Sequence, residues 1–336
     1  MQLILFKPNT MSFLKKLFGK NEAVTPEAER QKTEERQFNT LRDSGVRAMK
    51  MREVKLALPY FEKALELRPD DLQTTSYLVE TLLLMQEYER VLEPLGRLAV
   101  AEPDNLEIQL ILAQTQGRTG RYEEMRATTA ALLESHSDDA RVPYLAAEAA
   151  HGLKDEFAAI AYLTQALQIR ECYSQALLLR ARILAGMGQW REALADTTAL
   201  AAAHAEDEEG LILHADAQAA TDDADGAEAT YRNVLALNPF NREAFLHLGK
   251  LYETTNRLDK ALALYDEAVG EMPDFAEAYK MRGGVKLRLH DEAGATDDLK
   301  KSLELRPEMG QELDGEYSNL ENRLNDQMRN LNPYKF

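Results

Sequence analysis

A repeat of 34 residues is the feature of this sequence that most constrains its fold. Residues 57–69 and 261–273 are similar to one another and lie 204 residues apart, which is six times 34. Rows of 34 residues fit the chain eight times without an insertion or deletion: 38–71, 72–105, 106–139, 140–173, 174–207, 208–241, 242–275 and 276–309. Such a period indicates one supersecondary unit stacked on copies of itself.

Small and large apolar residues recur at fixed positions of the rows. Position 8 is mostly small: Gly45, Val79, Ala113, Ala147, Ala181, Ala215, Gly249 and Gly283. Position 20 is mostly alanine: Ala57, Val91, Met125, Ala159, Ala193, Ala227, Ala261 and Ala295. Position 24 carries a larger apolar residue in six rows: Phe61, Leu95, Leu163, Tyr231, Tyr265 and Leu299. Small residues at the first two positions predict close helix packing, because the distance between helix axes follows side-chain size.

Helix breakers divide each row into two parts. Turn formers stand between positions 11 and 17, as in Thr119–Arg121, Met187–Gln189 and Thr255–Arg257. Five rows carry a proline near their end, at Pro69, Pro103, Pro239, Pro273 and Pro307. A proline stops one helix and starts the next. Each row is therefore predicted to be a helix–turn–helix unit that buries its apolar face only when stacked on its neighbours.

These positions resemble the tetratricopeptide repeat (TPR), a family with a small residue at position 8, Ala at 20, an aromatic residue or Leu at 24, Ala at 27 and Pro at 32. The resemblance covers 272 of 336 residues. Rows 3 to 5 depart from it most, with Ser137, Glu171 and Ala205 at position 32. The resemblance implies an all-α fold, a right-handed superhelical α-solenoid of eight 34-residue repeats over residues 38–309.

A leader precedes the repeats in residues 1–37. Its segment 11–20 places apolar and basic residues on opposite arcs of a helix: Phe13, Leu14, Leu17 and Phe18 against Lys15, Lys16 and Lys20. A short basic amphipathic segment is typical of weak peripheral contact with an anionic membrane or of docking to a partner, and the alternative is a frayed leader. Thr25 and Pro26 predict a helix that begins at about residue 26 and leads into the first row. Met11 is a second candidate start of the chain.

Residues 310–336 follow the repeats. They contain one apolar stripe at helical spacing: Leu313, Tyr317, Leu320, Leu324, Met328 and Leu331. Repeat arrays require a cap on their last exposed face, so this segment is predicted to be a capping helix with a short tail. The alternative is a dimerising coiled coil, and we expect a monomer.

The residues that carry chemistry are scattered through the chain. None of the six His is spaced from another His or from Cys172 as metal ligands are, and no Gly-rich phosphate loop follows a strand. The single Cys excludes a disulfide framework and fits a reducing compartment. The net charge of -17 makes nucleic acid a poor ligand. We therefore predict no catalytic residues, no cofactor, no metal, and a protein that is not an enzyme.

The resemblance implies that positions 2, 5, 9, 12 and 13 of each row face the inner groove. Positions 5 and 9 of rows 3 to 7 are the candidate partner-binding residues: Leu110, Tyr144, Glu148, Leu178, Arg182, Ile212, Asp216, Leu246 and Lys250. An apolar floor beside polar groups suits an extended or helical segment of another protein. The alternative is that position 5 packs against the next row. Positions 2, 5 and 9 together hold five bases and seven acids, so the groove is predicted to be mixed in charge.

The leading hypothesis is a non-enzymatic scaffold in the cytoplasm that binds a protein or peptide in its groove. A membrane-peripheral assembly or chaperone-like factor is the first alternative, which would place the leader at the inner face of the membrane. A self-associating structural subunit is the second. The TPR domains that bind chaperone C-termini hold the carboxylate with a cluster of Lys, Asn and Arg. Residues such as Val46, Tyr77 and Glu107 stand at those positions here, which argues against that ligand.

Overall fold

The computed structural model describes residues 26–307, and these are helical and contain no strand. They form two compact units that join in sequence between Asp155 and Glu156. Unit 1 contains α2 (Pro26–Lys50), α3 (Val54–Leu67), α4 (Leu72–Leu84), α5 (Tyr88–Ala101), α6 (Leu106–Arg118), α7 (Tyr122–Ser135) and α8 (Arg141–Gly152). Unit 2 contains α9 (Glu156–Ile169), α10 (Ser174–Gly186), α11 (Trp190–Ala203), α12 (Glu208–Ala220), α13 (Ala224–Leu237), α14 (Arg242–Thr254), α15 (Leu258–Glu271), α16 (Ala276–Arg288) and α17 (Glu292–Leu305).

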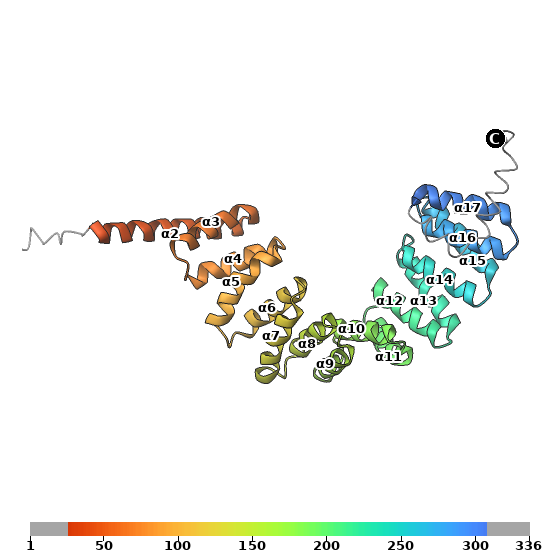
Figure 1. Ribbon diagram of the computed structural model, residues 1–336, viewed down its shortest axis with the longest axis horizontal. Coiled ribbons are helices and arrows are strands. Elements are labelled where there is room, and N and C mark those ends of the chain that lie inside the picture. The colour runs from red at the N-terminus through yellow and green to blue at the C-terminus, as the bar shows by residue number, and fades with distance from the viewer. Residues whose placement is uncertain (1–25, 308–336) are drawn as a thin grey trace, which may run out of the picture. The chain divides into compact units, whose positions relative to one another are not determined.

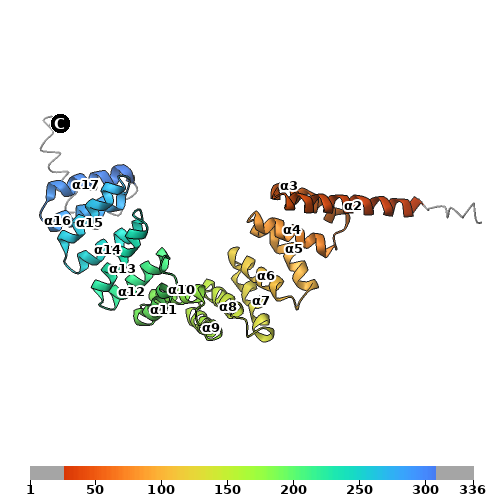
Figure 2. The same ribbon diagram turned by 180° about the vertical axis from the view of Figure 1, so that it is seen from behind.

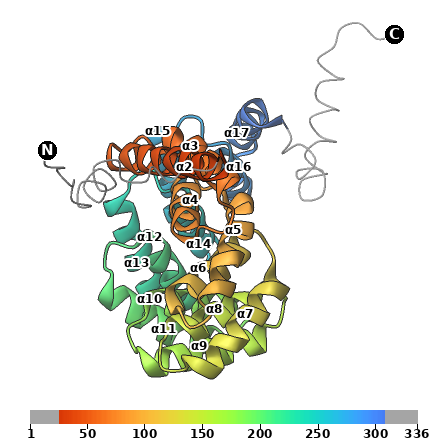
Figure 3. The same ribbon diagram turned by 90° about the vertical axis from the view of Figure 1, so that its left-hand side faces the viewer.

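Consecutive helices pack against one another within each unit. In unit 1 every helix contacts the next one along the chain (Figure 1), and Figure 3 shows them following one another from α2 and α3 to α7 and α8. In unit 2 the same holds from α9 to α17 (Figure 2). The first helices of neighbouring rows also touch, as α12 does with α10 and α14. The prediction of an all-α repeat of helix pairs is confirmed.

Two sequence segments lie outside the described residues. These are the basic segment from Phe13 to Lys20 and the apolar stripe from Leu313 to Leu331, with the capping helix predicted there. The fourth row, 140–173, is divided between the units, because α8 belongs to unit 1 and α9 to unit 2. The stretch ahead of Phe38 and the first helix of the first row form one helix, α2, of 25 residues.

The turn inside each row has the same backbone geometry. The residue at position 15 has a positive φ of 57–74° in all eight rows: Arg52, Gln86, Gly120, Lys154, Gly188, Asp222, Asn256 and His290. The next N–H donates to a carbonyl five residues back, as Gln189 N does to Leu184 O at 2.8 Å. This 6→1 bond around a left-handed residue is the Schellman ending of a helix. It satisfies the terminal carbonyls of the first helix and turns the chain into the second.

Side chains at position 34 start several of the following first helices. Asp71 accepts a hydrogen bond from Thr74 N at 2.8 Å, and Asn241 accepts one from Ala244 N at 2.8 Å. Such N-caps satisfy amide groups that have no partner inside the helix. They fix where these first helices begin.

Small residues at position 8 of the first helix pack against the large residues at position 24 of the second helix, as the sequence pattern predicts. A Cβ at Gly45 would lie 2.6 Å from Phe61 Cε1, and one at Gly283 would lie 3.1 Å from Leu299 Cγ. Phe61 is buried, and so is Tyr265, which covers Gly249 in row 7. Close approach of the two helices of a row therefore depends on the small residue. Among the described residues, no helix is both long enough and apolar enough to cross a bilayer.

Candidate interaction surface

The apolar residues of position 5 divide into two groups by burial. Leu110 is 3% exposed and belongs to a core cluster of unit 1 that includes Val142 and Leu145 of the next row. Ile212 is 4% exposed and belongs to the core of unit 2. A partner cannot contact side chains this deeply buried, so at these two positions the packing alternative applies and the assignment to a binding floor is corrected. Tyr144, Leu178 and Leu246 are half-buried.

The polar residues of position 9 have different surroundings. In unit 1 Glu148 accepts a hydrogen bond from Tyr144 Oη at 2.9 Å, and burial raises the pKa of its carboxyl group. In unit 2 Arg182 is exposed and forms an ion pair with Glu209. Leu110, Tyr144 and Glu148 belong to unit 1, and the other six predicted residues belong to unit 2. In unit 2 two of them, Asp216 and Lys250, line one cavity.

This cavity lies on α12 and α14 of unit 2 and has a volume of about 730 Å³. Helix α12 contributes Asp216, Ala219 and Ala220, and the following turn and α13 contribute Asp222, Ala224 and Tyr231. Helix α14 and its C-cap contribute His247, Lys250, Leu251, Thr254 and Thr255, and α11 contributes Trp190. Five of its lining residues stand at positions that the resemblance assigns to the inner face: Asp216, Ala219, Ala220, Lys250 and Thr254. We call it the Trp190 cavity.

Asp216 organises one side of the Trp190 cavity. Its Oδ1 accepts a hydrogen bond from Tyr231 Oη and lies 2.7 Å from His247 Nδ1. A carboxylate only accepts hydrogen bonds, so His247 Nδ1 carries the proton. The hydrogen bond to Asp216 raises the pKa of His247, while burial and Asp216 raise the pKa of Tyr231. The two rings meet edge to face, with centroids 6.2 Å apart. These contacts tie α12, α13 and α14 together and hold the carboxylate in one place.

Two opposite charges stand at the Trp190 cavity without an ion pair. Asp222 and Lys250 are both exposed, and neither forms a salt bridge with any residue in the range 26–307. Trp190, the only Trp of the chain, supplies an aromatic wall. Sequence reasoning missed Trp190, Asp222 and His247. His247 stands at position 6 of its row, and the spacing to position 9 of the preceding row could have linked it to Asp216.

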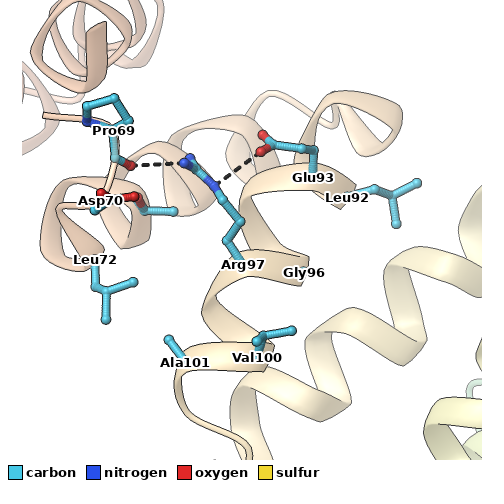
Figure 4. A pocket seen from close by; sticks show the side chains of 10 residues that line it. Pro69, Asp70, Leu72, Leu92, Glu93, Gly96, Arg97, Val100 and Ala101 are labelled. Atoms are coloured by element: carbon cyan, nitrogen blue, oxygen red, sulfur yellow. Dashed lines mark hydrogen bonds and ion pairs between the residues drawn. The ribbon is translucent and has the colours of Figure 1, made fainter. Parts of the chain in front are cut away.

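A second depression lies in unit 1 and is almost entirely apolar. Leu72, Leu92, Gly96, Val100 and Ala101 line it (Figure 4), and the Val100 side chain is highly exposed. Arg97 crosses its edge, donating to Pro69 O at 2.9 Å and pairing with Glu93 at 3.1 Å (Figure 4). Asp70, which is exposed, also lines this depression.

Comparison with known proteins identifies the repeat. One family model described as tetratricopeptide repeat matches residues 212–276, which include most of the Trp190 cavity, and a second with the same description matches residues 48–71. The chain is a tetratricopeptide repeat protein. No curated protein matches this TPR protein in sequence.

Several solved structures are similar to this chain, and one of them, a TPR protein, shares its fold. A tetratricopeptide repeat protein from Parabacteroides merdae ATCC 43184 is 17% identical, with a TM-score of 0.52 over 70% of this chain and 93% of that one. A MamA protein is 20% identical over 53% of this chain and 94% of its own, with a TM-score of 0.46. YrrB, described as a TPR protein with an unusual peptide-binding site, is 17% identical over 53% and 92%, with a TM-score of 0.44.

The family sets the general function of this TPR protein. TPR units are protein–protein interaction scaffolds, and the family is in general non-enzymatic. Among the residues that the structure describes, no three His, Cys, Asp or Glu side chains are grouped as metal ligands would be. Cys172 is exposed.

Proposed function

We propose that this scaffold binds a segment of a partner protein on the first helices of unit 2, with one side chain of that segment in the Trp190 cavity. The cavity is the observation that carries the proposal. It is large enough for a peptide side chain, and it combines an apolar surface from Trp190, Leu251 and three alanines with polar groups that can fix the orientation of a ligand. Asp216 is already oriented by two donors, so it loses little freedom when a partner binds.

Half-buried apolar residues continue the surface away from the cavity. Leu178 on α10 and Leu246 on α14 stand at position 5, and Leu213 on α12 stands at position 6. Partly exposed Leu side chains on neighbouring helices can pack against the apolar face of an extended or helical segment. Together with the cavity they give an apolar surface beside a group of polar side chains.

The proposal is tested by filling the cavity. Ala220 is exposed and lines it, whereas Ala229 on α13 is equally exposed and does not. Tagged full-length chain, Ala220→Tyr and Ala229→Tyr are used to capture proteins from cells that express this chain, with identification by mass spectrometry. Partners recovered by the wild type and by Ala229→Tyr should be depleted about tenfold or more from Ala220→Tyr. Equal recovery by Ala220→Tyr, with helix content unchanged by circular dichroism, contradicts the proposal.

A further inference from the structure

We infer that the Trp190 cavity takes a basic side chain, arginine or lysine, from the partner segment. This inference rests on the proposed function and adds the chemistry of the residue that enters the cavity. It departs from the mixed-charge groove expected from positions 2, 5 and 9, because Asp222 and Trp190 stand at other positions of their rows.

The charge around the cavity favours a cation. The row that supplies α12 and α13, residues 208–241, holds seven acids and one base. Two of those acids, Asp216 and Asp222, line the cavity itself, and Glu243 at the start of α14 is close enough to influence Tyr231 and His247. Lys250 and, where it is protonated, His247 are the opposing positive charges, against these three acids. A visiting cation therefore meets more attraction than repulsion, and a visiting carboxylate meets the reverse.

The geometry of Asp216 leaves an acceptor for such a cation. Both hydrogen bonds from Tyr231 and His247 end on Oδ1, and Oδ2 receives no hydrogen bond from residues 26–307. The Asp216 side chain is 25% exposed, so a partner can reach it. A guanidinium or ammonium donor in the cavity can satisfy Oδ2 without breaking the existing contacts.

The indole of Trp190 also favours a guanidinium or ammonium group. Trp190 lines the cavity together with Ala219, Ala220 and Ala224, which leave space beside the indole. A cation over an aromatic face is attracted by the negative centre of the ring, and Trp is the strongest such partner. The aliphatic stem of Arg or Lys can pack on the alanines while its charged head reaches the carboxylates.

The test uses three peptides without Trp, blocked at both ends, that are identical except for Arg, Gln or Glu at their centre, with Leu residues on either side. They are titrated into the full-length chain at low salt, and binding is followed by the emission of Trp190, the chain's only Trp. We expect the Arg peptide to bind about tenfold more tightly than the Gln and Glu peptides. Raising the salt concentration should reduce that preference.

Two charge variants give effects of opposite sign. Asp222→Asn should weaken binding of the Arg peptide about three- to tenfold, and Lys250→Gln should strengthen it by a similar factor. Asp259→Asn and Lys300→Gln, exposed positions away from the cavity, are the matched controls and should leave the affinity unchanged.

The outcomes distinguish a wrong side-chain chemistry from a wrong binding site. Tighter binding of the Glu peptide, with loss of affinity in Lys250→Gln, overturns the basic side chain and assigns an acidic one. Equal affinities for all three peptides also overturn it, while the proposed function stands. If no peptide changes the emission of Trp190, the proposed site and this inference are both wrong.

Discussion

Arg180 binds Asp196 through two hydrogen bonds, and the same arrangement recurs 102 residues later, three repeat lengths on, between Arg282 and Asp298. In both pairs Nε donates at 2.8 Å and Nη2 at 2.6 Å. The remaining Nη1 donates to position 25 of the preceding row, which is Thr164 for Arg180. Each guanidinium therefore joins both helices of its own row to the second helix of the row before.

Removing the carboxylate should destabilise α10 and α11. The Asp196 side chain is 5% exposed and that of Arg180 is 21% exposed, so Asp196→Ala leaves a largely buried cation without its partner. We expect a loss of about 2–3 kcal/mol, below the range for fully buried pairs because Arg180 keeps some contact with water. Hydrogen exchange of the amides in α10 and α11 measures this loss locally.

The same helix offers a control for this prediction. Arg182 forms an ion pair with Glu209, and both side chains are exposed. Arg182→Ala should cost less than about 1 kcal/mol, since exposed pairs contribute little. If both variants cost the same, the Arg180–Asp196 pair is no more important than a surface pair.

Glycine at position 15 should stabilise rows that lack it. Gln86 has a φ of 59°, a conformation that costs residues with a Cβ more than it costs glycine. We expect Gln86→Gly to stabilise α4 and α5 by about 0.5–1 kcal/mol, and Gly188→Ala, where φ is 74°, to destabilise α10 and α11 by about 1 kcal/mol. Hydrogen exchange of the flanking helices measures both changes. A stabilising Gly188→Ala would show that the left-handed turn is not required there.

Alanine should have opposite effects at two glycines of neighbouring helices. A Cβ at Gly249 would overlap the phenol of Tyr265, so Gly249→Ala should cost about 1–3 kcal/mol as α14 and α15 move apart. A Cβ at Gly270, inside α15, meets nothing within 4 Å. Gly270→Ala should therefore stabilise by about 0.5–1 kcal/mol through the better helix propensity of alanine. Urea unfolding followed by circular dichroism compares the two, and equal effects would contradict the close packing at Gly249.

His247 and His214 should titrate on opposite sides of 6.5, the ordinary pKa of a histidine side chain. The hydrogen bond to Asp216 raises the pKa of His247, and burial lowers the pKa of His214. The stabilisation from charged His247 is present below pH 6.5 and is lost as the pH rises through its pKa in the folded chain. The stabilisation from neutral His214 is present above pH 6.5. It is lost as the pH falls towards the lowered pKa of His214 in the folded chain. NMR titration of the ring protons measures both values.

Asp216→Asn provides the control for the titration. It removes the charge that stabilises the His247 cation, so the pKa of His247 should fall while that of His214 stays the same. A raised His247 pKa that persists in Asp216→Asn would mean that another group is responsible.

The 34-residue period can be predicted from the sequence, because each repeat packs its two helices with small and large residues at the same positions. Gly45 and Gly249 could be paired with Phe61 and Tyr265 by position alone, since helix spacing depends on residue size. The left-handed residue at position 15 could not be read in every row, because Arg52, Gln86 and Lys154 carry no signal for a positive φ. There the surrounding helices impose the conformation on an unfavourable residue.

The sequence by itself determined the helix pairs, their period and the family, because these follow from apolar spacing within about 34 neighbouring residues. Only the tertiary structure decided which residues of position 5 are available to a partner. Leu110 and Ile212 are buried while Leu178 and Leu246 are not, although all four are aliphatic residues at the same position. It also decided that Asp216, Trp190 and His247 share one cavity, since they come from three helices whose packing brings them together. Exposure and juxtaposition depend on how neighbouring rows pack, and that is a property of the folded chain.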